Sequence, residues 1–86
     1  MKTKKLYESK AAARNEERYG ITATSCICCN KPTNEDFFVH MSTEWEVIPA
    51  LATDEMLQQA GIESQGLFPI GSSCAKKMGD KYIILA

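Results

Sequence analysis

The sequence has no long apolar run, only one histidine and no strong excess of charge of either sign. A helix that spans a bilayer needs about 20 consecutive apolar residues, and no stretch of this chain approaches that length. Residues 1–20 are charged throughout and lack the apolar core of a signal peptide. We therefore expect a cytoplasmic protein whose thiols stay reduced, with no membrane partner.

Several catalytic motifs are also missing. The chain contains no HExxH motif and no Gly-rich phosphate loop. Zinc deaminases place an H-x-E motif before their P-C-x-x-C motif, whereas here the CxxC pair comes first and His40 is followed by Met-Ser. The sequence therefore predicts a protein that is not an enzyme.

Charge is distributed unevenly along the chain, although the net charge is only −1. Residues 1–19 carry six basic and three acidic side chains, residues 20–70 carry one and seven, and residues 71–86 carry three and one. The ends are therefore basic and the middle is acidic. A domain that binds nucleic acid over its whole surface would show a strong basic excess, which this one lacks.

A chain of 86 residues predicts one domain with a small core, which a bound metal often reinforces. We predict a small zinc-stabilised α+β fold, with an N-terminal helical segment in 1–20 and a zinc-binding domain in 21–86. The N-terminal helix is expected over residues 4–19, capped by Thr3 and ended by Gly20. In that domain the pattern predicts short strands, including a hairpin, and two short helices. The expected strands are 21–25, 37–41, 45–48, 67–70 and 81–85, with a loop at 62–66. The expected helices are 54–60, capped by Thr53 and followed by Gly61, and 71–78, ended by Gly79.

The stretch from Cys26 to Pro32, which reads Cys-Ile-Cys-Cys-Asn-Lys-Pro, is the most informative motif. Cys26 and Cys29 have the CxxC spacing that turns two sulfurs toward one metal. Such a turn needs a left-handed residue after the second cysteine, and Asn30 tolerates that conformation. Two alternatives remain: a redox-active cysteine pair and, in a secreted chain, disulfides.

Two further ligands are needed to complete a tetrahedral zinc site. His40 is the only histidine, and Cys74 is the only cysteine outside the motif. We therefore predict one structural Zn²⁺ ion held by Cys26, Cys29, His40 and Cys74. The surplus thiol, Cys28, is expected to point away from the metal. Three lysines next to ligands in sequence are expected to offset the negative charge of the site: Lys31, Lys76 and Lys77.

These residues, together with the stretch Phe-Pro-Ile-Gly-Ser-Ser-Cys-Ala-Lys-Lys at 68–77, resemble a pattern found in small bacterial and phage proteins. Those proteins are similar to treble-clef or zinc-ribbon modules. The resemblance covers residues 24–78 and implies zinc binding and a phage or mobile-element origin. Asn30 stands where such proteins usually have glycine, and Cys28 is an added thiol.

A protein partner, such as a host protein of a phage, is the first functional hypothesis. A metal lets a very small domain present a rigid surface, and the acidic segment 35–63 contains Trp45 and suits a basic partner. The alternative is a zinc-finger-like accessory protein that binds nucleic acid, with Arg14 and Arg18 among the residues that would contact phosphates.

Overall fold

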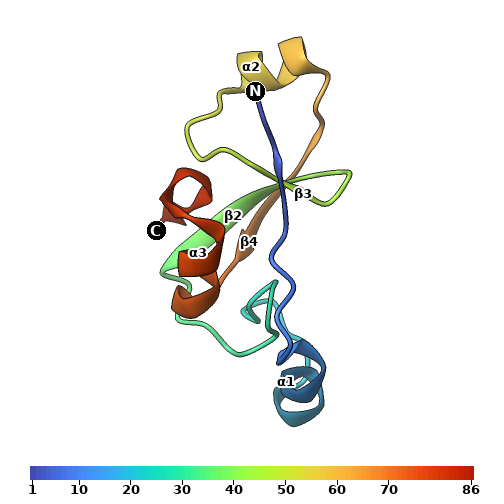
Figure 1. The fold of residues 1–86 in the computed structure, drawn as a ribbon, viewed down its shortest axis with the longest axis vertical. Helices are drawn as coiled ribbons and strands as arrows, with labels where there is room; N and C mark the ends of the chain where they lie inside the picture. Colours follow the sequence, from blue (N-terminus) through green and yellow to red (C-terminus); the bar gives the residue numbers. More distant parts are fainter.

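A five-stranded antiparallel sheet with three helices around it forms the fold, and the computed structural model describes all of residues 1–86. Strand β2 lies at the centre: it pairs with β4 along one edge, and β3 and β5 share its other edge. This is the predicted α+β class (Figure 1). The elements are β1 (Lys4–Lys5), α1 (Ala12–Tyr19), β2 (Phe37–Ser42), β3 (Glu46–Ile48), α2 (Asp54–Ala60), β4 (Ser64–Pro69), α3 (Ser72–Met78), a 3₁₀ turn (Asp80–Tyr82) and β5 (Ile84–Leu85).

The central strand β2 divides its side chains between the two faces of the sheet. Val39 and Met41 are fully buried, whereas His40 between them is only half-buried. Successive side chains of a strand point to opposite faces. Val39 and Met41 therefore define the core face, and His40 lies on the other one.

The main core lies between the core face of the sheet, helix α3 and the cysteine loop. Cys26, Cys28 and Cys74 belong to it, together with six other buried residues: Val39, Met41, Val47, Ile70, Ala75 and Met78. Ile48 and Leu57 are buried outside this cluster. The cysteines are thus part of the core as well as candidate ligands.

The predicted N-terminal helix over residues 4–19 is wrong in its first half. The chain begins with strand β1, in which Lys4 and Lys5 pair with Val47 and Glu46 of β3, and the helix begins only at Ala12. Thr3 does not cap a helix, because its hydroxyl donates to the Glu46 carboxylate instead. Pairing with the open edge of β3 therefore overrides the local helix propensity.

The remaining elements follow the sequence pattern more closely. Thr53 caps α2 by accepting a hydrogen bond from the Met56 N–H at 3.2 Å, and Gly61 ends that helix in the left-handed region. Helix α3 begins at Ser72, one residue after the predicted start, and ends at Gly79 as predicted. Strand β4 begins at Ser64, inside the predicted loop, and residues 21–25 contribute only one isolated bridge, between Ser25 and Pro32.

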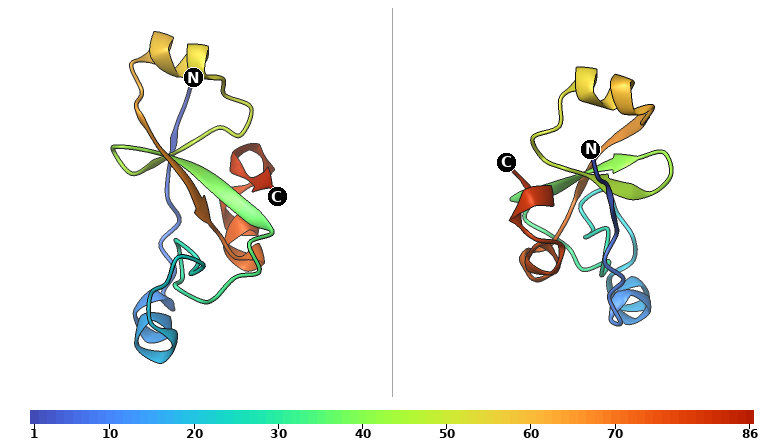
Figure 2. Two further views of the ribbon diagram at one scale, coloured as in Figure 1. Left: turned by 180° about the vertical axis from the view of Figure 1, so that it is seen from behind. Right: turned by 45° about the horizontal axis from the view of Figure 1, so that its top comes forward.

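The molecule is elongated, with extents of 41 × 21 × 20 Å. Helix α1 lies at one end of the long axis and α2 at the other, and the sheet and α3 lie between them (Figures 1 and 2). No helix combines the length and the apolar character that a bilayer span requires. The α1 end comprises α1, the cysteine loop at 26–30 and the start of α3. The α2 end comprises α2 and the hairpin between β2 and β3, because the Thr43 N–H of that hairpin donates to the Glu63 carbonyl just after α2.

Candidate metal centre

The loop that carries three of the cysteines is a tight turn. The Asn30 N–H donates to the Cys26 carbonyl and the Cys26 N–H to the Lys31 carbonyl, both at 2.8 Å. Asn30 has a φ of 62°, which confirms the predicted left-handed residue. The loop is fixed to the sheet by the Ile27 N–H, which donates to the Pro69 carbonyl at 2.9 Å.

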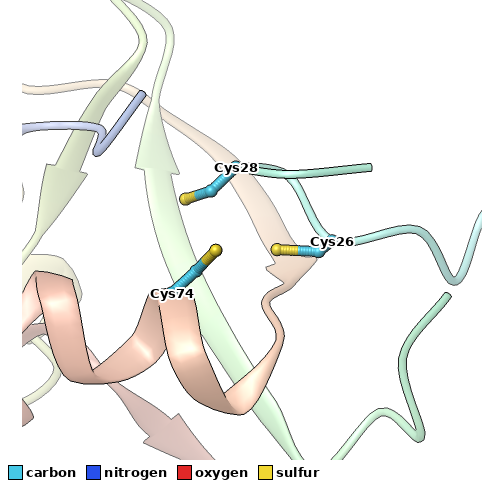
Figure 3. A group of neighbouring side chains, drawn as sticks. All are labelled: Cys26, Cys28 and Cys74. Atoms are coloured by element: carbon cyan, nitrogen blue, oxygen red, sulfur yellow. The ribbon is translucent and has the colours of Figure 1, made fainter. Parts of the chain in front are cut away.

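Three sulfurs converge where this loop meets α3. The Sγ atoms of Cys26, Cys28 and Cys74 lie within 4.8 Å of one another, and all three residues are buried (Figure 3). The expectation that Cys28 points away is wrong. Residues 26–30 close a turn of i→i+4 type, and a turn does not project alternate side chains to opposite sides as a strand does.

Cys29, the second cysteine of the CxxC pair, lies at the rim of this cluster. It is half-buried, and its thiol is close enough to contribute to the raised pKa of Cys74. Cys29 and Cys74 also border the same hollow at the surface. The chain therefore brings all four of its cysteines to one place, three in the core and one at its edge.

The three buried sulfurs fit the geometry of a bound metal ion. In a tetrahedral site with Zn–S bonds of about 2.3 Å, the sulfurs are about 3.8 Å apart. The three sulfurs lie within 4.8 Å of one another, which is close to that separation, and the cysteines form no disulfide. Three or four thiols in this arrangement could therefore hold a metal ion.

Electrostatics within the cluster already favour one thiolate. Hydrogen bonds from the Cys28 thiol and from the backbone N–H groups of Gly71, Cys29 and Cys28 lower the pKa of Cys26 to about 4, although burial opposes this shift. The hydrogen bond with Cys26 and burial both raise the pKa of Cys28. Burial, reinforced by the charge of Cys26, raises the pKa of Cys74 to about 12. The cluster thus holds one negative charge easily, and a cation is needed to stabilise more.

The structure does not bring His40 to the sulfurs. His40 lies on the face of β2 opposite the core face, and its Nε2 atom forms a 2.5 Å hydrogen bond with the Ser64 hydroxyl on β4. Its neighbours Val39 and Met41 are the residues that pack with the cysteines. The alternation of side chains along β2 therefore separates His40 from the cluster.

Of the three lysines that were expected to offset the charge of the site, two lie near the cysteine cluster and one does not. Lys31 borders the hollow at Cys29 and Cys74, and Lys77 lies in a neighbouring cleft that reaches the same two cysteines. Lys76 instead borders a separate groove near Asp80. Proximity in sequence to a ligand therefore predicted nearness to Cys29 and Cys74 correctly for Lys31 and Lys77 but not for Lys76, because it cannot distinguish the two faces of α3.

The predicted partner-binding residues lie at opposite ends of the molecule. Arg14 and Arg18 on α1 border the cleft that contains Lys77. Trp45 lies in the hairpin between β2 and β3 and is 58% exposed, with its ring centroid 6.0 Å from that of Phe68.

Two asparagines that sequence reasoning did not connect fix α1 against the cysteine loop. The Asn15 side chain donates to the Cys29 carbonyl at 2.8 Å, and the Asn30 side chain donates to the Ala12 carbonyl at 3.1 Å. No local pattern indicates such a pair, because the two partners are more than ten residues apart in the chain.

For Cys28, the sequence did contain a signal for the inward position, because free cysteine has a strong tendency to be buried.

No protein-family model matches this chain, and neither a curated protein nor a solved structure matches it.

Proposed function

We propose that the cysteine cluster holds one structural zinc ion through four thiolates, those of Cys26, Cys28, Cys29 and Cys74. The observation that carries this proposal is the convergence of three buried sulfurs within 4.8 Å, with Cys29 beside them. This set replaces the histidine of the sequence-based prediction by Cys28. Thiolates are soft ligands that select zinc, copper(I) or iron–sulfur clusters, and one tetrahedral set of four sulfurs suits a single zinc ion.

In our proposal this zinc ion is structural and not catalytic. Catalytic zinc keeps one position open for water or substrate and usually has three protein ligands. Four thiolates would leave no open position, and three of these ligands are buried. We therefore propose a protein that is not an enzyme and in which the metal supplies folding free energy.

The proposed metal would connect parts of the chain that are distant in sequence. It would link the loop at 26–29 to α3 at Cys74, and α1 is already bound to that loop by Asn15 and Asn30. Zinc with four thiolates has a net charge of −2, and Lys31 and Lys77 are close enough to offset it. The site would thus hold the α1 end together.

We further propose that the α2 end binds a protein partner with a basic surface. Trp45 there has a φ of 62°, a conformation that costs an aromatic residue about 1–3 kcal/mol. The Trp45 N–H donates to the Ser42 carbonyl at 3.0 Å, so Trp45 occupies a hairpin position that usually holds glycine. A strained, exposed tryptophan supports a binding role, since tryptophan often dominates interface energy.

Two glutamates, Glu44 and Glu46, flank this tryptophan in the chain. A hollow of about 450 Å³ next to the hairpin is bordered by Glu44, Glu46 and Glu63, and no lysine or arginine borders it. The charge of this hollow supports a basic partner, because opposite potentials steer association and favour the correct complex.

The test compares capture of partners from a bacterial lysate by the wild type, Trp45→Gly and Trp45→Phe after nuclease treatment. Glycine suits the backbone at this position, so Trp45→Gly should keep its fold while it loses an anchor of about 2 kcal/mol. We expect a specific basic protein that the wild type captures, Trp45→Gly loses and Trp45→Phe partly retains. Equal capture by the wild type and Trp45→Gly, or no reproducible protein, would contradict the proposal.

A further inference from the structure

A basic cleft runs between α1 and α3 at the α1 end. It has a volume of about 370 Å³, and four cationic side chains border it, while no aspartate or glutamate does. Arg14 and Arg18 come from one face of α1, since residues four apart lie on the same face of a helix. Lys31 comes from the cysteine loop and Lys77 from α3. Three separate parts of the chain therefore contribute positive charge to one concave site.

The four cations at this cleft carry more positive charge than is needed to offset the negative charge of the proposed metal centre. A zinc ion with four thiolates would have a net charge of −2, which Lys31 and Lys77 together offset. Arg14 and Arg18 then remain as an uncompensated pair that faces the cleft. Clustered positive charge of this kind attracts anionic ligands.

Two tyrosines, Tyr7 and Tyr19, border the same cleft. Tyr19 is 42% exposed, and the guanidinium carbon of Arg18 lies 5.4 Å from the centre of its ring. Tyr7 is half-buried against the core, so Tyr19 offers the exposed ring. Sites that bind single-stranded nucleic acid combine cations, which contact phosphates, with exposed aromatic rings, on which bases stack.

The shape of the site favours a single strand over a duplex. Proteins that read duplex DNA commonly insert a projecting helix into the major groove. Helix α1 has only eight residues, and its two arginines line a concave cleft. We propose that this cleft binds single-stranded nucleic acid, with phosphates at Arg14 and Arg18 and a base stacked on Tyr19. This inference does not depend on the proposed protein partner, and it uses the proposed metal only for the charge balance.

The test measures binding of a labelled oligothymidylate of about 12 nucleotides, which is within the usual site sizes, by fluorescence anisotropy of the full metal-loaded chain. Two phosphate contacts predict a slope of about −1.4 for log K against log salt. Affinity should therefore fall about sevenfold between about 50 and 200 mM salt.

The main variant is Arg14→Gln/Arg18→Gln, and its matched control is Lys5→Gln/Lys76→Gln, which removes two positive charges outside the cleft. The first should bind more weakly, with a slope of about zero, while the control keeps most of the affinity and the slope. Tyr19→Ala should lose about tenfold in affinity, and Tyr19→Phe should keep it. Metal content and circular dichroism of each variant establish that its fold is intact.

Three results would overturn the inference. The first is no binding of the oligonucleotide at about 50 mM salt, where electrostatic binding is strong. The second is equal loss in the cleft variant and its control, which would indicate attraction to net charge alone. The third is a polyglutamate peptide that binds through Arg14 and Arg18 at least as tightly as the oligonucleotide, which would assign the cleft to an acidic protein.

Discussion

The two ends of this molecule differ in charge and in what holds them together. The α1 end contains the four cysteines and the basic cleft, and its helix has no buried residue. The α2 end contains the acidic hollow, and its helix buries only Leu57. In our account a metal stabilises the first end, and a capped helix with one apolar anchor stabilises the second.

This difference shows how a chain with 13 buried residues can form two surfaces of opposite charge. A small core leaves little apolar burial for each end. Hydrogen bonds from Asn15 and Asn30 fix α1 to the cysteine loop, so α1 depends on that loop for its position. Helix α2 depends instead on Leu57 and on its Thr53 cap. The ends should therefore respond differently to the same treatments.

Removal of the metal should have the largest effect. Structural zinc contributes about 10–16 kcal/mol to the folding of small domains, which is comparable to the total stability of a typical domain of about 5–15 kcal/mol. We expect a strong chelator to unfold the chain, as measured by circular dichroism during titration. A chain that keeps its thermal transition after complete metal removal would show that the α1 end does not depend on a metal.

Acid should weaken metal binding steeply. The raised pKa values of Cys28 and Cys74 keep both thiols protonated at neutral pH when no metal is bound, so a metal must displace at least two protons. Affinity should then fall about 100-fold or more for each pH unit as the pH is lowered. Competition with a coloured chelator between about pH 7 and 5 measures how the metal affinity changes with pH. A change of tenfold or less per unit would indicate that the metal displaces fewer than two protons and therefore does not bind both Cys28 and Cys74.

Leu57→Ala should destabilise the α2 end without releasing metal. Leu57 is 5% exposed, and the loss of a buried leucine side chain costs about 2–5 kcal/mol. Leu51→Ala is the matched control, because Leu51 is 92% exposed. Denaturant unfolding measures the stability, and elemental analysis should find the metal retained in both variants. Metal loss from Leu57→Ala alone would show that the two ends are coupled.

Local sequence signals predicted the elements whose determinants lie within a few residues. Thr53 and Gly61 delimit α2, and Gly79 ends α3, as capping chemistry predicts. Asn30 took the expected left-handed conformation because the turn itself requires it. These features depend on neighbouring residues and not on the rest of the fold.

Features that depend on distant contacts could not be predicted in the same way. Lys4 and Lys5 form a strand because β3 offers them an open edge, although the local composition favours a helix. The candidate site shows the same limit. Elimination selected His40 as the fourth ligand, but the alternation of β2 places it on the other face and the turn brings Cys28 inward.

The central claim is that the metal at the α1 end is held by four cysteines and not by the histidine. Zinc content of purified Cys28→Ser and His40→Gln, measured by elemental analysis alongside the wild type, tests it most directly. The account predicts one zinc per chain in the wild type and in His40→Gln, and loss of zinc in Cys28→Ser. Zinc retained by Cys28→Ser, or lost from His40→Gln, would contradict it.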